Sequence, residues 1–97
     1  MTLDEILRQI LKYKKPEKIV IFGSRAGGDF DKTSDIDIAI FAKSWSSEDV
    51  NHIRDQLEEY VKTPLKFDVI DFYRLTKKSL KEKILRKGKI IYESRAD

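Results

Sequence analysis

The sequence contains no cysteine, and its aromatic and turn-forming residues are few, with one tryptophan, two prolines and four glycines. Without cysteine, disulfides and thiolate metal sites are excluded, which fits a reducing compartment. The apolar stretches, such as Ile19–Phe22 and Ile36–Phe41, are too short to cross a membrane. The first residues form a polar, amphipathic run rather than a signal peptide. We therefore expect a soluble, cytoplasmic protein.

A length of 97 residues corresponds to one domain, and we interpret residues 1–97 as a single domain. The hydrophobic fraction of 40% supports a modest core, and a domain this small is often stabilised by a partner. Charged residues make up 38% of the chain, with a net charge of only +3. The basic residues form two clusters, one with Lys12, Lys14, Lys15 and Lys18, the other with Lys77, Lys78, Lys81, Lys83, Arg86, Lys87 and Lys89.

These basic clusters have two interpretations. A basic run binds nucleic acid or an acidic partner in some proteins. More often it is the solvated face of a helix, where surface charges contribute little. The sequence leaves direct nucleic-acid binding open.

Hydrophobic periodicity predicts helices over about residues 2–14, 47–61 and 75–87, and strands over 18–22, 36–41, 66–71 and 89–93. Thr2 with Glu5 forms a possible capping box, and Ser46 or Ser47 is expected to cap the second helix. Gly88 is a candidate C-cap of the third helix. The order α-β-β-α-β-α-β predicts an α/β (α+β) fold, in which a small mixed sheet has helices packed against one face and the last strand at an edge.

Two carboxylates open the predicted strand at 36–41. Residues i and i+2 of a strand point to the same face, roughly 6–7 Å apart, so Asp35 and Asp37 project together. The isoleucines between and after them project to the other face, where helices can cover them. Neighbouring carboxylates repel unless a cation lies between them, and such oxygen ligands suit Mg²⁺ or Mn²⁺.

A phosphate-binding segment is expected ten residues before this pair. The strand at 18–22 runs into Gly23 and Ser24. Glycine lets a backbone approach a ligand closely, while a serine hydroxyl and free backbone N–H groups at a helix start hold phosphate. Arg25 is positioned to add positive charge, although a solvent-exposed arginine is the commoner outcome. Together with the carboxylates, these residues have the composition of a metal-nucleotide site.

Strand alternation selects a third carboxylate. Phe67 and Val69 are apolar and are expected to face the helices, which assigns Asp68 to the open face. Asp71 then lies on the helix side or beyond the end of the strand. Ile70 shares the face of Asp68 and needs cover from elsewhere. We therefore predict that Asp68 ligates a metal and accepts a proton.

The pattern of Gly-Ser, ten residues and Asp-x-Asp is expected by chance in roughly one in a thousand chains of this length. It resembles the signature of nucleotidyltransferases of the DNA polymerase β superfamily, and the short chain resembles the minimal nucleotidyltransferases (MNT) that pair with HEPN proteins. The resemblance spans nearly the whole chain and is most specific between Phe22 and Phe41. It implies a polymerase β palm-like fold.

The resemblance also implies roles for individual residues. Gly23 and Ser24 would bind the triphosphate of ATP, the substrate. Asp35, Asp37 and Asp68 would be the catalytic residues and would ligate Mg²⁺, with two ions expected. Related sequences often read Gly-Ser-Arg-Ala-Arg-Gly, whereas Gly27 stands here at the fifth position, so a basic residue near the phosphates is missing. Similar MNT proteins are antitoxins that adenylylate a tyrosine of a HEPN ribonuclease toxin.

Several functions remain open. The leading interpretation is transfer of AMP from ATP to a hydroxyl of a HEPN partner, because a chain of this length has no separate acceptor-binding domain. The alternatives are nucleotidyl transfer to a small molecule with help from a partner subunit, and an antitoxin that neutralises its partner by binding alone. Outside the motif, we expect Trp45 at the edge of the core, with a partner contact as the alternative, and His52 on the surface.

Overall fold

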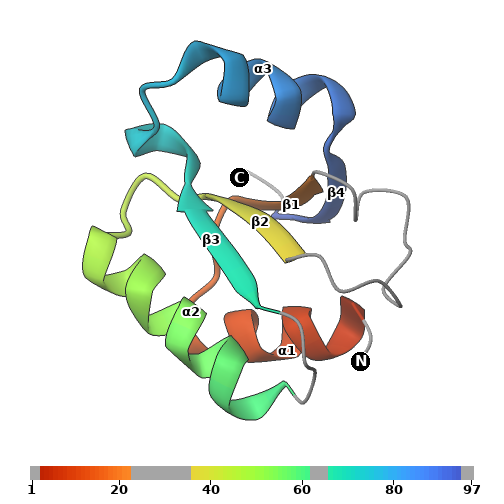
Figure 1. Ribbon diagram of the computed structural model, residues 1–97. Helices are drawn as coiled ribbons and strands as arrows, with labels where there is room; N and C mark the ends of the chain where they lie inside the picture. Colours follow the sequence, from red (N-terminus) through yellow and green to blue (C-terminus); the bar gives the residue numbers. More distant parts are fainter. Residues whose placement is uncertain (1–2, 23–35, 62–65, 95–97) are drawn as a thin grey trace.

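The computed structural model describes residues 3–22, 36–61 and 66–94, and the statements below concern this part of the chain. The helices pack around one sheet (Figure 1). The elements are α1 (Leu3–Tyr13), β1 (Lys18–Phe22), β2 (Ile36–Phe41), α2 (Ser47–Tyr60), β3 (Phe67–Asp71), the short 3₁₀ helix η2 (Phe72–Arg74), α3 (Lys78–Lys87) and β4 (Lys89–Glu93).

The four strands form one mixed sheet in the order β3-β2-β1-β4. β1 pairs antiparallel with β2 and with β4, whereas β2 and β3 pair parallel. A parallel pair requires a crossover connection, and α2 provides it. The predicted mixed sheet with β4 at its edge is therefore confirmed.

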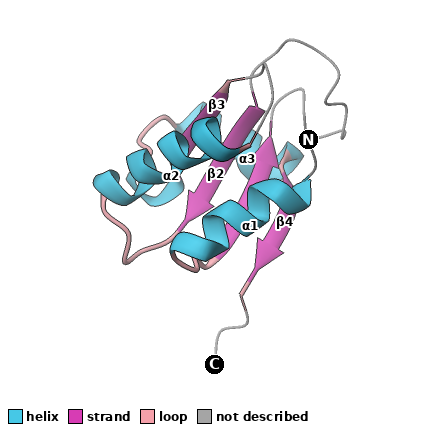
Figure 2. Ribbon diagram, turned by 90° about the horizontal axis from the view of Figure 1, so that it is seen from below, coloured by secondary structure: helices cyan, strands magenta, loops and turns pink. Residues whose placement is uncertain are grey.

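The first face of the sheet carries most of the core. Ile19, Ile21 and the isoleucines of β2 are almost fully buried there, together with Ile6 and Ile10 of α1 and the apolar side of α2. α1 and α2 lie side by side across this face (Figure 2). A polar contact also joins these helices, because the Gln56 side-chain amide donates to the backbone oxygen of Gln9 over 3.1 Å. Two of the three helices thus lie where the sequence predicted.

The expectation that all helices share one face is wrong for α3, which covers the opposite face (Figure 1). Ile84 of α3 is buried there against Val20 and Phe22 of β1 and Ala39 and Phe41 of β2. The reason is that β1 and β2 are central strands with apolar side chains at successive positions, so both of their faces need cover.

The ends of α2 and α3 show how local sequence sets the helix boundaries. Ser46, rather than Ser47, caps α2, and its side chain forms a reciprocal capping box with Asp49. α3 begins at Lys78 instead of the predicted Leu75, because Leu75 is extended and packs against the second cluster. The capping box expected at Thr2 lies outside the described residues.

Gly88 follows α3 directly, as predicted, and its backbone N–H donates to the oxygen of Ile84. Its φ of −71° is accessible to any residue, so the glycine is not required for a left-handed turn. Space is the constraint, because a Cβ atom at this position would lie 2.3 Å from the Ile84 oxygen and 2.4 Å from Val20 Cγ1. Glycine thereby allows β4 to begin immediately beside α3.

In the part of the chain that the structure describes, no helix has the length and apolar character needed to cross a bilayer.

Candidate active site

Asp37 of β2 and Asp68 of β3 are direct partners in the parallel pairing of these strands. Adjacent strands lie about 4.8 Å apart, so the two residues are one strand spacing from each other. Both side chains project to the face that carries Ala39 and Phe41, because Ile36 and Ile38 on either side of Asp37 are buried in the opposite cluster. Asp37 is half-buried and Asp68 is exposed.

The register that aligns these carboxylates is fixed by burial and by the backbone. Phe67 and Val69 are buried with the helices α1 and α2, so Asp68 between them must point away. The backbone N–H of Ile36 donates to the oxygen of Lys66 over 2.8 Å and extends the ladder beyond the paired residues. A slip of one residue would bury Asp68 and expose both apolar neighbours, so the alignment is strongly specified.

The other carboxylate of β3 lies elsewhere. Asp71 pairs in register with Ile40, whose side chain belongs to the cluster under α1 and α2. Its side chain is 11% exposed and forms an ion pair of 3.1 Å with Arg74. Ile70, which the alternation rule left uncovered, packs against the second cluster beneath α3. The alternation predicted from the sequence therefore holds along β3.

The neighbour of Asp37 on its other side is Phe22, the last residue of β1. Phe22 is buried in the cluster beneath α3. Asp37 thus lies between an apolar side chain and a second carboxylate, at the end of the sheet where β1 finishes and β2 begins. An apolar neighbour lowers the local dielectric and strengthens electrostatic interactions with any bound cation.

The remaining predicted site residues, Gly23, Ser24, Arg25 and Asp35, lie outside the described residues. The geometry of the candidate site is accordingly that of Asp37, Asp68 and their neighbours. Sequence patterns did not connect α3 with this site, although α3 lies on the same face of the sheet. The local sequence does not determine which face of the sheet a helix covers. The link between α3 and the carboxylate pair is therefore seen only in the three-dimensional arrangement.

The donor chemistry of the pair fits a hard divalent cation. Mg²⁺ is often held by one or two carboxylates together with water and substrate phosphates, and Asp37 and Asp68 supply two carboxylates on one face. Among residues 3–22, 36–61 and 66–94, no group of three or more His, Cys, Asp or Glu side chains gathers in a way that would hold a metal. The described ligands are therefore a pair that requires further oxygen donors.

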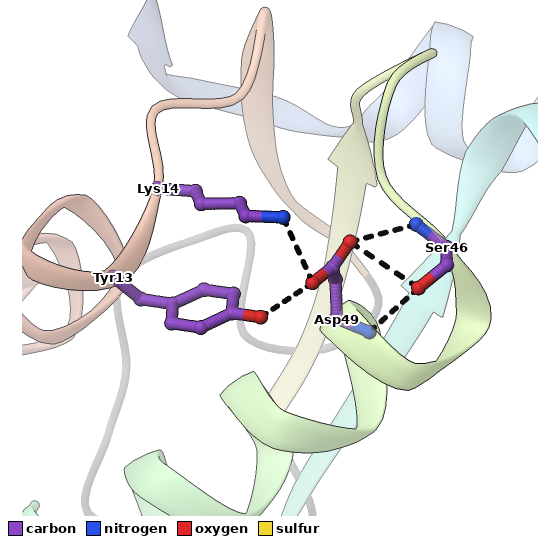
Figure 3. A network of polar contacts seen from close by, with 4 residues as sticks. All are labelled: Tyr13, Lys14, Ser46 and Asp49. Carbon is purple, nitrogen blue, oxygen red and sulfur yellow. Dashed lines mark hydrogen bonds and ion pairs between the residues drawn. The ribbon is translucent and has the colours of Figure 1, made fainter.

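A second polar cluster joins α1 to the start of α2 (Figure 3). The Tyr13 hydroxyl donates to Asp49 Oδ1, and Lys14 Nζ lies 3.1 Å from the same oxygen. The backbone N–H of Ser46 donates to Asp49 Oδ2 over 2.8 Å. The pKa of Asp49 is lowered, first by the Tyr13 hydroxyl, then by the Ser46 N–H and Lys14. The pKa of Tyr13 is raised, mainly by its hydrogen bond to the Asp49 carboxylate.

This cluster is structural. It lies on the helix side of the sheet, beyond the end of β2 and away from the face that Asp37 and Asp68 share. Its rings also pack closely, since Tyr13 stacks on His52 with 4.3 Å between ring centroids and meets Trp45 edge to face at 5.9 Å. Trp45 is buried and His52 is exposed, as predicted. The network therefore joins two helices and has no direct connection to the carboxylate pair.

The sequence was compared with models of protein families and with curated proteins. The family model described as "Polymerase beta, Nucleotidyltransferase" matches residues 4–97. No curated protein sequence matches this chain.

Several solved structures with the same fold are toxin–antitoxin pairs. A mutant of the toxin–antitoxin MntA–HpeT is 18% identical with a TM-score of 0.78, covering 98% of this chain and 75% of that one. A toxin–antitoxin with AMP-PNP is 22% identical with a TM-score of 0.73, covering 97% and 76%. MntA–HepT is 20% identical with a TM-score of 0.70, covering 94% and 69%. Identities this low show a common fold and no more.

Proposed function

Because the chain belongs to the polymerase β nucleotidyltransferase family, we propose that it transfers AMP from ATP to a tyrosine hydroxyl of a HEPN toxin and thereby acts as an antitoxin. The observation that carries this proposal is the direct pairing of Asp37 with Asp68 on one face of the sheet, where Asp68 is exposed. Two carboxylates one strand spacing apart are an arrangement suited to Mg²⁺-dependent phosphoryl chemistry.

In the proposed reaction the acceptor hydroxyl attacks the α-phosphorus of ATP. A new oxygen–phosphorus bond forms, the bond from the α-phosphorus to the bridging oxygen breaks, and pyrophosphate leaves. Asp68 takes the proton of the attacking hydroxyl, which its exposed position allows. Gly23, Ser24 and Arg25 hold the phosphates in this proposal.

Asp35, Asp37 and Asp68 would hold the Mg²⁺ ions. Bound Mg²⁺ would neutralise charge that develops on the phosphate oxygens. The half-buried position of Asp37 beside Phe22 excludes part of the solvent from this end of the sheet, which makes the carboxylate a stronger anchor for a cation.

The choice of acceptor is supported by the solved neighbours, which are toxin–antitoxin pairs, one of them with AMP-PNP. Phosphoryl transfer depends mainly on positioning, so a protein acceptor must place its hydroxyl against the face that carries Asp37 and Asp68. We expect the toxin partner to bind against the exposed side chain of Asp68.

The test is a transfer assay with ATP labelled at the α-phosphate, Mg²⁺ and a HEPN toxin of the MntA–HepT type. Label is expected to move to the toxin with the wild-type chain and to be absent with Asp37→Asn. Asp55→Asn, on the exposed side of α2, is the matched control and should transfer normally. Transfer that persists in EDTA or in Asp37→Asn would contradict the mechanism. Toxin neutralisation by Asp37→Asn without transfer would identify a binding antitoxin instead.

A further inference from the structure

The helices α2 and α3 carry opposite charges. α2 contains five acidic residues and one basic residue, Arg54, whereas α3 contains five basic residues and one acidic residue, Glu82. The net charges are therefore −4 and +4, in a chain whose total is only +3. α1, which lies beside α2, has two acidic and two basic residues and is neutral. Because α2 and α3 cover opposite faces of the sheet (Figure 1), one side of the sheet presents an acidic helix and the other a basic helix.

Most of these charges are available for a contact with another molecule. Asp49 of α2 is buried and paired with Lys14. The other charges of α2 and α3 form no ion pair within the described part of the chain. Eight of them are exposed, namely Glu48, Asp55, Glu58, Glu59, Lys78, Lys83, Arg86 and Lys87. A helix with its side chains is about 10–12 Å across, so the outward charges of α2 and α3 lie more than about 20 Å apart. The Debye length at physiological salt is about 8 Å, so the two sets do not neutralise each other within one chain.

The charges at one end of each helix also oppose the helix dipole. The C-terminal end of a helix has a partial negative charge, which a basic residue in the last turn stabilises. α2 has no basic residue in its last turn and ends instead with Glu58 and Glu59. The N-terminal end has a partial positive charge, yet α3 has no acidic residue in its first turn and begins with Lys77 at the N-cap and Lys78. Each of these two ends therefore lacks the opposite charge that the other end would supply.

We propose that α2 of one copy of this chain binds α3 of a second copy, with the two helices antiparallel. This orientation brings the acidic C-terminal end of α2 against the basic N-terminal end of α3, so Glu58 and Glu59 face Lys77 and Lys78. The partial charges of the two helix ends are also opposite where they meet. Tyr60, which is 65% exposed beside the two glutamates, presents its ring to the lysines for a cation–π contact.

The contact uses a different surface on each copy, because α2 and α3 lie on opposite faces of the sheet. A contact of this kind repeats from copy to copy and builds a ring or an open chain of molecules. Ion pairs at a surface contribute little individually, so we expect the association to be weak and to disappear at high salt. This inference is independent of the proposed function, because neither ATP nor the toxin takes part in the contact.

The experiment is sedimentation velocity on the full chain over a range of protein concentrations, without nucleotide or toxin. At about 10 mM salt, the average mass of the wild type is expected to rise with concentration beyond that of a dimer. At about 1 M salt, where the Debye length falls to about 3 Å, it should return to the monomer value. The two test variants are Glu58→Lys/Glu59→Lys and Lys77→Glu/Lys78→Glu. Each alone is expected to weaken the association about tenfold or more, and an equimolar mixture of the two should restore it, because the reversed ends are again complementary.

The matched control is Lys15→Glu/Lys43→Glu, which changes the net charge as much as Lys77→Glu/Lys78→Glu does, at exposed positions outside the helices. The control is expected to associate as the wild type does. A wild-type chain that stays monomeric at low salt would overturn the proposal. An equal loss of association in the control would show an effect of net charge alone and would overturn it as well. The same holds for a mixture of the two test variants that stays monomeric, once melting curves show that both variants are folded.

Discussion

Asp37 and Asp68 are paired across a parallel ladder, so two carboxylates of the same charge lie one strand spacing apart on one face of the sheet. Like charges directly opposite in a sheet destabilise it. An apolar or neutral pair would stabilise the strands better at this position. A cation bound between the two carboxylates would offset this repulsion, which is consistent with the proposed metal site.

Mg²⁺ together with ATP is expected to raise the melting temperature of the protein. The ligand binds the folded site and not the unfolded chain, so it stabilises the folded state by mass action. Substitution Asp68→Asn is expected to increase the stability of the metal-free protein by up to about 1 kcal/mol, because it removes the repulsion with Asp37. Thermal melts with and without Mg²⁺ and ATP measure both effects.

The control for this measurement is Asp55→Asn, which removes an exposed carboxylate of α2 and should keep the full ligand effect. A melting temperature that does not respond to millimolar Mg²⁺ and ATP would count against a metal-nucleotide site. A ligand effect of equal size in Asp68→Asn would show that this carboxylate is not part of the site.

Asp68 and Asp71 allow a direct test, within one strand, of the prediction that Asp68 and not Asp71 points to the same face as Asp37. Asp68→Asn is expected to lower the rate of AMP transfer about a hundredfold or more, the usual scale for a general base. Asp71→Asn is expected to retain most activity, because the Asp71 carboxylate is paired with Arg74 on the other side of the strand. Single-turnover assays with the toxin present give both rates. If the losses were reversed, Asp71 would be the third carboxylate.

Much of the sheet was predictable from side-chain periodicity. The bounds of β1 and β2 agree with the predicted ranges, and β3 begins one residue later than predicted. Alternation also placed Phe67 and Val69 in the core and left Asp68 exposed. These predictions succeed because a strand has two faces, and burial of one face fixes the direction of every second side chain.

The position and the start of α3 were not predictable in the same way. Ile84 fits an apolar stripe whichever face of the sheet it covers, so periodicity does not choose between the faces. Leu75 has the spacing of a helical residue but packs as an extended one before α3 begins. Gly23, Ser24, Arg25 and Asp35 remain predictions from the sequence motif.

Gly88→Ala is expected to destabilise the protein by about 1–3 kcal/mol, the range for forcing extra volume into packed surroundings. The added methyl group would overlap the Ile84 carbonyl oxygen and the buried side chain of Val20. Lys89→Ala, at the next, exposed position, serves as the control and should change stability by less than about 0.5 kcal/mol. Urea denaturation measures both. A Gly88→Ala variant as stable as the wild type would show that α3 shifts freely on the sheet.

The network around Asp49 predicts an acid-dependent loss of stability. The pKa of Asp49 is lowered in the folded state, chiefly by the Tyr13 hydroxyl, so the folded protein holds this carboxylate deprotonated more strongly than the unfolded chain does. The resulting stabilisation is fully present above the ordinary pKa of 3.8 and is lost as the pH falls below that value toward the lowered one. Asp49→Asn should therefore be less stable than the wild type at neutral pH and should lose less stability between about pH 4 and pH 2.

Tyr13→Phe tests whether the Tyr13 hydroxyl causes the acid-dependent loss of stability. It removes the largest contribution to the lowered pKa of Asp49 while keeping the aromatic ring that stacks on His52. The pKa of Asp49 should move back toward its ordinary value, and the acid-dependent loss should become smaller than in the wild type but larger than in Asp49→Asn. Melting temperatures of the three proteins between about pH 2 and pH 7 provide the comparison. If Asp49→Asn lost as much stability as the wild type over the acid range, the loss would arise from other carboxylates, and Asp49 would titrate alike in the folded and unfolded chains.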